Sequence, residues 1–270
     1  LNLVERVDEA SWRVLARPGR RLKAGDVLQF DGAFEAEILS GDESGAFEVR
    51  FSVSGDALEA ALDAYGAMPL PPYIARRRAA DSQDRQDYQT SFAGDEAESV
   101  AAPTAGLHFT KALLDRIDAS GAIREMVRLH VGLGTFAPLK EEQIKDSRLH
   151  SEWRKLGSET AGRLNRTRKE GGRVIPVGTT ALRTLESSLN EAGHFIPTSG
   201  PTDIFIKPGD AVRSTDALMT NFHLPRSSLF MLVCAVMGTD VMQAAYAHAV
   251  RETYRFYSYG DACLLLPERA

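Results

Sequence analysis

The first 55 residues contain short runs in which apolar and polar positions alternate, at 12–15, 27–30, 34–39 and 47–53. Glycine, proline and aspartate separate these runs and are typical of tight turns. Strands this short and evenly spaced predict a small β-barrel or part of one. The first residues have the pattern of the middle of a strand, so we expect a further N-terminal piece in the complete protein.

The pattern changes after residue 55. Apolar positions share one face of a short helix predicted over 56–65. The proline-rich stretch 68–73 follows as a stiff, extended linker. We therefore predict two domains, a small β-barrel domain over 1–57 and an α/β domain, expected to carry the chemistry, over 58–270.

The remainder of the chain alternates helical and strand patterns. Thr110, Ser158 and Thr180 are suitable residues for capping helix N-termini. This alternation predicts a layered α/β/α domain with a mainly parallel sheet, in which ligands bind at the carboxyl ends of the strands. The predicted helices are 110–120, 158–170, 180–192, 228–237 and 240–253, and the predicted strands are 123–131, 174–177, 203–206 and 262–266.

Composition narrows the class of protein. With 270 residues, 43% of them apolar, the chain can bury a substantial core. No run approaches the ~18 apolar residues that span a bilayer. Cys234 and Cys263 both have apolar neighbours, which favours buried free thiols in a reducing cytoplasm and gives no zinc-ligand spacing. We expect a cytoplasmic protein with no membrane partner.

The formal net charge of −5 argues against a protein that coats nucleic acid, which would show a basic excess. It leaves a local basic face open. Three clusters of basic residues lie at 17–23, 76–78 and 163–173. Each cluster alone is better explained by a solvated surface than by an RNA site.

Histidines give the first indication of a site. The chain has six, and four of them lie in predicted loops or at strand ends: His108, His130, His150 and His223. A single histidine in such a place is more often structural. Four in one domain favour a shared site, because imidazole titrates near neutrality and serves in proton transfer.

A glycine-rich segment follows the strand that ends at residue 131. Gly132, Gly134 and Ala137 match the dinucleotide pattern G-x-G-x-x-A, and Glu152 follows at the expected distance. This match alone would favour an oxidoreductase that binds NAD. Pro138, however, allows a helix only after the motif, so we interpret the glycines as permitting close backbone approach to some other ligand.

A second loop, Gly178-Thr179-Thr180, joins a predicted strand to a helix. Its free N–H groups could bind a carboxylate, and an ordinary capped turn is an equal alternative. In the helix that follows, Arg183 and Glu186 share a face. They form either a buried pair that positions a substrate or a surface pair of little energetic consequence.

The segment 254–261 concentrates aromatic side chains beside Arg255 and Asp261. Aromatic faces stack on nucleobases, and Tyr257 and Tyr259 are the expected stacking residues. Packing of these rings in the core is an equally common outcome, and we expect it for Phe256.

Seven segments in a fixed order resemble the S-adenosylmethionine:tRNA ribosyltransferase-isomerase family of queuosine biosynthesis. They are 103–110, 130–136, 150–153, 177–186, 202–206, 220–225 and 254–262. The resemblance runs from about residue 88 to the end. The family has further sequence before the position of Leu1, including an Asn-Asp-Thr-Arg segment that nothing here matches.

The resemblance implies an activity. The family transfers and isomerises the ribosyl moiety of S-adenosylmethionine onto the 7-aminomethyl-7-deazaguanine in the anticodon of tRNA. The products are epoxyqueuosine-tRNA, adenine and methionine. The resemblance also implies a β-barrel with an α/β domain, S-adenosylmethionine as co-substrate, no permanently bound cofactor and no metal.

Among the motif residues we assign His108, His130 and His223 to proton transfer. Glu152 and Asp203 are assigned to sulfonium or hydroxyl contacts. Arg183 is expected to bind the methionyl carboxylate, together with a wider set of S-adenosylmethionine-binding residues. That set is Thr104, Gly106, Gly132, Gly134, Gly178, Thr179, Thr180, Arg183, Glu186, Tyr259 and Asp261.

The tRNA is expected to contact the basic residues at 76–78 and 163–169, and the protein to be a monomer. These assignments require a single cavity that gathers the histidines and the acids. Two other classes stay open, an NAD-dependent oxidoreductase and an RNA-binding module without catalysis.

Overall fold

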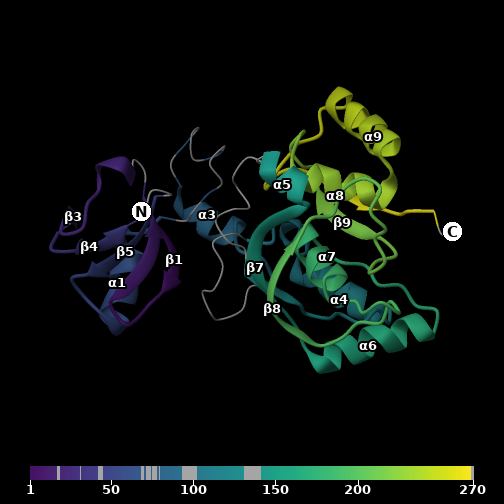
Figure 1. Ribbon diagram of the computed structural model, residues 1–270, viewed down its shortest axis with the longest axis horizontal. Coiled ribbons are helices and arrows are strands. Elements are labelled where there is room, and N and C mark those ends of the chain that lie inside the picture. The colour runs from purple at the N-terminus through teal and green to yellow at the C-terminus, as the bar shows by residue number, and fades with distance from the viewer. Residues whose placement is uncertain are drawn as a thin grey trace. The chain divides into compact units, whose positions relative to one another are not determined.

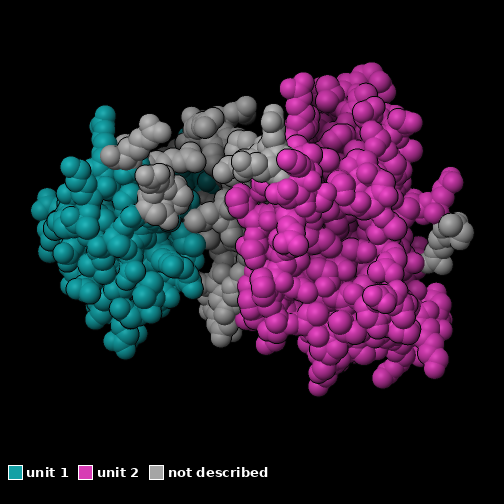
Figure 2. Space-filling model, viewed as in Figure 1, with its two compact units in different colours: residues 1–86, 95–101 teal, residues 87–94, 102–270 magenta. Residues whose placement is uncertain are grey.

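The computed structural model divides the chain into two compact units, Leu1–Gln86 with Asp95–Ala101, and Asp87–Gly94 with Ala102–Ala270 (Figure 2). Each unit is described by itself. The structure describes residues 1–16, 19–30, 32–41, 45–67, 70, 74, 78, 80–92, 102–130 and 141–268.

The first unit contains a five-stranded antiparallel sheet in the order β1-β2-β5-β4-β3 (Figure 1). Apolar side chains alternate along the strands and face one core, for example Val14, Ile38 and Val49. The predicted strands are present, but β1 and β3 are not paired with each other in the described residues, so a barrel is not confirmed. The strands are β1 (Asn2–Arg6), β2 (Ser11–Leu15), β3 (Val27–Gln29), β4 (Glu35–Gly41) and β5 (Ala46–Phe51).

Helix α1 (Gly55–Tyr65) confirms the predicted helix and buries Leu58 in the core of the first unit. By packing, α1 therefore belongs with the sheet that precedes it. The division into domains after residue 57 stays a prediction. The short elements η1 (Gly19–Arg21) and α3 (Ser82–Asp87) complete the helices of the described residues up to Asp87.

The second unit carries most of the predicted helices. The Thr110 hydroxyl accepts a hydrogen bond from Leu113 N at 3.2 Å, as predicted for a cap. Thr180 does not cap its helix, which begins one residue earlier with Gly178 at the N-cap. The helices are η2 (Thr104–His108), α4 (Lys111–Ala119), α5 (Glu141–Asp146), α6 (Ser158–Lys169), α7 (Thr179–Glu186), α8 (Ser228–Met237) and α9 (Thr239–Arg251).

The strands of this unit form two antiparallel sheets, β6-β7-β8 and β10-β9. The predicted strand at 174–177 contributes only an isolated bridge, between Val177 and Met219. The predicted strand at 123–131 is reduced to its last residues. The strands are β6 (Arg128–His130), β7 (Arg148–Leu156), β8 (Thr198–Ile204), β9 (Leu218–Asn221) and β10 (Ala262–Leu265).

The prediction of a mainly parallel sheet is wrong for the described residues, where every pair of named strands is antiparallel. The alternation of strands and helices misled the prediction. Helices α6 and α7 lie in sequence between β7 and β8, and α8 and α9 lie between β9 and β10, yet both strand pairs are antiparallel. A connection long enough for a parallel crossover does not impose one.

Helix α7 packs into two separate cores. Leu182 lies with Leu218 and Leu232 in a cluster built by β9, β10, α8 and α9. Leu185 lies with Leu156 in a second cluster, against β7 and α6. Because both leucines are buried, α7 is fixed on two sides. The N-terminus of α7 therefore has a well-defined place in the unit.

In the part of the chain that the structure describes, no single helix is long and apolar enough to cross a membrane. Helices α8 and α9 are long and apolar enough only when taken together, and the bend between them is 116°.

Candidate functional site

Asn221, the last residue of β9, connects two residues of η2. Thr104 Oγ1 donates a hydrogen bond to Asn221 Oδ1 at 3.2 Å, and Asn221 Nδ2 lies 3.3 Å from His108 Nε2. The amide nitrogen can only donate, so Nε2 accepts and the neutral imidazole carries its proton on Nδ1. Asn221 is buried and His108 is half-buried, which leaves part of the imidazole accessible.

Asp261 joins this group from the residue before β10. Its neighbour Ala262 pairs with Asn221 in the antiparallel register. The backbone N–H of Arg255 donates to the Asp261 carboxylate at 2.7 Å and lowers its pKa, and the Arg255 guanidinium and, when protonated, the His108 imidazole lower the pKa further. Asp261 therefore presents a negative charge near His108 at neutral pH.

The loop before α7 packs against η2. Gly178 has a φ of 89°, a value that favours glycine, and its N–H donates to Met219 O at 2.8 Å. A Cβ at Gly178 would lie 3.7 Å from the Ala105 Cβ. The structure thus brings Thr104, His108, Gly178, Asn221 and Asp261 together, and we call this group the η2–β9 site.

Gly106 is required at its place in η2. A Cβ there would lie 2.8 Å from Phe92 Cδ2, too close for either ring or backbone to stay in position. The Phe92 ring packs edge-on against Phe109 at 5.6 Å between centroids. Segment 87–92 thereby packs against η2.

We expect Gly106→Ala to destabilise the protein by about 1–3 kcal/mol, because the new methyl group overpacks the contact with Phe92. Urea denaturation measures the effect. Gly162→Ala on α6 is the matched control, since a Cβ there meets nothing within 4 Å and alanine favours a helix by about 0.5–1 kcal/mol. Equal stability changes in the two variants would contradict the close contact.

Tyr259 also lies beside segment 87–92. Its ring is 5.5 Å from the ring of the buried Tyr88, with an angle of 57° between the planes. The predicted stacking residue is thus half-buried against another tyrosine. Phe256 packs with Phe222 and Tyr246, which confirms its place in the core.

Arg183 forms a buried ion pair with Glu152 of β7, through Nη1. The prediction that it pairs with Glu186 is wrong. The Glu186 carboxylate instead accepts backbone N–H groups of Arg213 and Ser214, at 2.8–3.1 Å. Arg183 and Glu186 are three residues apart in the helix, which suggested a pair. The carboxylate of Glu152 on β7 lies nearer, and the local sequence does not show this.

The guanidinium of Arg183 is incompletely satisfied. Its side chain is only 7% exposed, and Nε and Nη2 have no hydrogen-bond partner among the described residues. Leaving buried charged donors unpaired costs free energy. Arg183 lies about 7.5 Å along the axis of α7 from Gly178, and helical side chains tilt toward the helix N-terminus, which here is the η2–β9 site.

The described contacts do not bring His223 to this site. His223 is buried, with Nε2 2.9 Å from Thr220 Oγ1, and its backbone N–H donates to the Tyr246 hydroxyl at 2.8 Å. Burial lowers its pKa from 6.5 to about 4, so it is neutral at pH 7. These partners belong to the core between β9 and α9.

The His223 pKa predicts a pH effect on stability. The unfolded chain takes up a proton near pH 6.5 and the folded protein only near pH 4, so the stabilisation is complete above 6.5 and is lost as pH falls between these values. The expected loss is roughly 3 kcal/mol at pH 4. The free energy of unfolding, measured with denaturant at pH 7.5 and 4.5, should differ less between the two pH values in His223→Gln than in the wild type. The same pH dependence in the variant and the wild type would contradict the role of His223.

The remaining predicted residues lie elsewhere or outside the described residues. Asp203 is half-exposed and pairs with Arg148 at 3.4 Å. Its neighbour Thr202 pairs in register with Glu152, so Asp203 points to the other face of the sheet. His130 pairs with Trp153 through the backbone, but its side chain lies outside the described residues, as do Gly132 and Gly134.

Comparisons with known proteins decide the family. The model of a family described as queuosine biosynthesis protein matches residues 2–265. A relative from Hyphomonas neptunium, named S-adenosylmethionine:tRNA ribosyltransferase-isomerase, is 63% identical over 99% of this chain and 76% of its own length. A relative of the same name from Maricaulis maris is 52% identical over 98% of this chain and 75% of its own length. The chain belongs to the queuosine biosynthesis protein family.

A solved structure agrees. The crystal structure of the S-adenosylmethionine tRNA ribosyltransferase from Thermotoga maritima is similar, with 33% identity and a TM-score of 0.51. The alignment covers 98% of this chain and 73% of that one. The family resemblance inferred from the seven segments is therefore confirmed, and this chain spans about three quarters of the length of these queuosine biosynthesis proteins.

Asn221 is the site residue that sequence reasoning missed in this queuosine biosynthesis protein. It stands in the segment 220–225, but the histidine two residues on drew the assignment. The available signal was its place in a segment shared with the family; the strand that ends at Asn221 was not predicted. A buried amide that contacts two other motif residues is the kind of group that fixes an imidazole.

Metal and thiol chemistry find no support in the described residues. No group of three or more His, Cys, Asp or Glu side chains there could hold a metal ion. Cys234 is buried and Cys263 half-buried, both are free, and burial raises both pKa values, that of Cys263 to about 11. The predicted burial is confirmed for Cys234, whereas Cys263 is half-buried.

Proposed function

We propose that this chain acts as an S-adenosylmethionine:tRNA ribosyltransferase-isomerase, with its chemistry at the η2–β9 site. The ribosyl moiety of S-adenosylmethionine is transferred to the 7-aminomethyl-7-deazaguanine of the tRNA anticodon and isomerised, with release of adenine and methionine. The observation that carries the proposal is the 63% identity over 99% of the chain to a relative of that name. Residues of four separate family segments meet at the site.

His108 serves as the proton-transfer group. The sulfonium acidifies the adjacent C5′ protons, and removal of one gives an ylide-like carbanion that drives loss of adenine. Adenine leaves with the electrons of its glycosidic bond and takes up a proton. The exocyclic amine of the deazaguanine then forms a bond to a ribosyl carbon and releases a proton, and methionine leaves with the C5′–S electrons as a ribosyl oxygen closes the epoxide. Asp261 stabilises the charged imidazole, since its carboxylate lies near His108.

Arg183 binds the methionyl carboxylate. A carboxylate would accept from Nε and Nη2, the two nitrogens without a partner among the described residues. Glu152 holds the guanidinium in place through Nη1. Thr179 and Thr180, at the N-terminus of α7, offer backbone N–H groups to the substrate, while the N–H of Gly178 donates to Met219 O.

Several assignments stay predictions within this proposal. They concern proton transfer by His130 and His223, contacts of Glu152 and Asp203 with the sulfonium or a hydroxyl, and the monomeric state. Ligand contacts of Gly132, Gly134, Glu186 and Tyr259 also stay predictions.

Release of free adenine tests the proposal. The full-length enzyme is incubated with S-adenosylmethionine and tRNA that carries the 7-aminomethyl-7-deazaguanine, and adenine is quantified by chromatography. We expect adenine in proportion to modified tRNA, and none above background with tRNA that lacks the aminomethyl group. Binding of tRNA without adenine release would identify an RNA-binding module instead. Binding of NAD would favour an oxidoreductase.

A further inference from the structure

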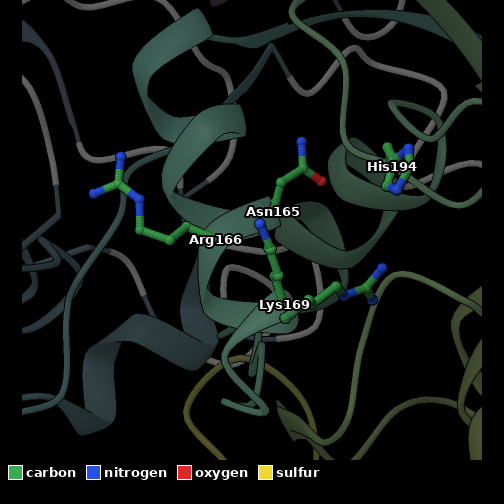
Figure 3. Close-up of a pocket in the computed structure, with 5 residues that line it drawn as sticks. Asn165, Arg166, Lys169 and His194 are labelled. Carbon is green, nitrogen blue, oxygen red and sulfur yellow. The ribbon is translucent and has the colours of Figure 1, made fainter.

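A hollow of about 560 Å³ lies on the surface of the second unit, over the C-terminal half of α6. Its lining includes Asn165, Arg166 and Lys169 of one helix and His194 of the neighbouring loop; in Figure 3 Arg166 extends from the helix away from His194. Arg168 completes the lining. We propose that this surface, the α6 hollow, contacts the phosphate backbone of the tRNA substrate; the inference rests on the proposed function.

The floor of the α6 hollow is held by hydrogen bonds. Asn165 Nδ2 donates to Phe195 O and Asn165 Oδ1 accepts from Phe195 N, both at 2.8 Å. Arg168 donates to Gly193 O at 3.2 Å and to Arg213 O at 2.6 Å, and its guanidinium lies 4.5 Å from the centre of the Phe195 ring. The loop that carries His194 is therefore fixed against α6.

Arg166 and Lys169 are available to bind an anionic ligand. Arg166 and Lys169 are exposed, and no carboxylate of the described residues lies within ion-pair distance of either. Arg163, one turn earlier on the same helix, is instead paired with Glu125 and Glu159. Arg166 and Lys169 are three residues apart and so lie on one face of α6.

This concentration of charge is not expected from composition, because the chain has 37 acidic against 32 basic residues. Unpaired guanidinium and ammonium groups on an open surface suit phosphodiesters, which dominate protein–RNA contacts without reading sequence. None of the five lining residues has a buried polar atom without a partner, as an enclosed site for a small anion would need. In the other preferred cluster, Arg78 is paired with Asp84 at 2.5 Å and with Asp81, while Arg76 and Arg77 lie outside the described residues.

Stabilisation of the helix is the competing explanation. Basic residues in the last turn interact favourably with the C-terminal end of the helix dipole. On that account Arg166→Glu and Lys169→Glu would lower the melting temperature and leave tRNA binding unchanged. If the α6 hollow contacts tRNA, the same substitutions weaken tRNA binding.

The test is adenine release by the full-length enzyme at saturating S-adenosylmethionine, as a function of tRNA concentration, at several salt concentrations. We expect Arg166→Glu and Lys169→Glu each to raise the KM for tRNA at least about fivefold near 0.1 M salt, with kcat within twofold of wild type. The salt dependence of kcat/KM should become shallower by about 0.7–0.9 in log–log slope per lost contact. Arg116→Glu on α4 makes the same charge change at an exposed residue and should leave the KM unchanged.

A KM for tRNA in both variants equal to that of Arg116→Glu would overturn the proposal. If a reversal fails to fold, the neutral double variant Arg166→Ala/Lys169→Ala takes its place with the same expectations. Wild-type enzyme that releases no adenine refutes the proposed function instead, so the two failures are distinguishable. In that event direct tRNA binding by the same variants decides the surface.

Discussion

Replacing His108 with alanine is expected to lower the rate of adenine release by at least about 100-fold, because a positioned acid–base group typically contributes ~10²–10⁴-fold. The change also removes the hydrogen-bond acceptor of the buried Asn221 amide, which costs about 1–3 kcal/mol, so a melting curve has to show that the variant is folded. Single-turnover adenine release, with tRNA and S-adenosylmethionine both saturating, measures the effect on chemistry rather than on binding.

The matched control is His248→Ala. His248 lies exposed on α9, where it contacts Arg251 and the ring of Tyr254. We expect wild-type turnover and an unchanged melting temperature for this variant. Near-wild-type turnover in a folded His108→Ala would remove His108 from the mechanism. A large loss in His248→Ala would show that the assay is sensitive to any histidine change.

Replacing Arg183 should raise the KM for S-adenosylmethionine by about 30-fold or more, the effect expected for truncating a buried charged hydrogen-bonding partner. The single change Arg183→Met also removes the guanidinium that pairs with the buried Glu152 carboxylate. That alone should destabilise the protein by about 3–5 kcal/mol. Activity loss in the single variant therefore mixes two causes.

The double variant Glu152→Leu/Arg183→Met separates them. Removing both charges replaces a buried ion pair with apolar side chains, which is often neutral for stability. We expect denaturant unfolding to return close to wild type while the KM for S-adenosylmethionine stays high. A double variant that is stable and binds S-adenosylmethionine as the wild type does would exclude Arg183 as the carboxylate ligand.

Local features of the fold could be predicted from the sequence. The Thr110 cap, the alternation that buries Val49 in β5 and the apolar face of α1 depend on residues a few positions apart. Strand direction could not be predicted. It depends on which partner each strand meets, as when Ala262 pairs with Asn221 across two helices. The sequence pattern is the same for either direction.

For the candidate site, too, most of the residues could be predicted from the sequence but their contacts could not. His108, Asp261, Thr104 and Gly178 stand in segments that the sequence singled out, because polar groups at strand ends and loops suggest chemistry. Their common contact with the end of β9 is a matter of tertiary packing. The Arg183–Glu152 pair joins residues 31 positions apart, while the nearer Glu186 was the more obvious partner.

The two-sided packing of α7 has a consequence for ligand binding. Leu182 and Leu185 tie this helix to different cores, and Arg183 stands between them. A ligand that binds the Arg183 guanidinium restrains both cores through one short rigid element. Amide hydrogen exchange should therefore slow in β9 and β7 together when S-adenosylmethionine is added, although the two strands belong to separate sheets.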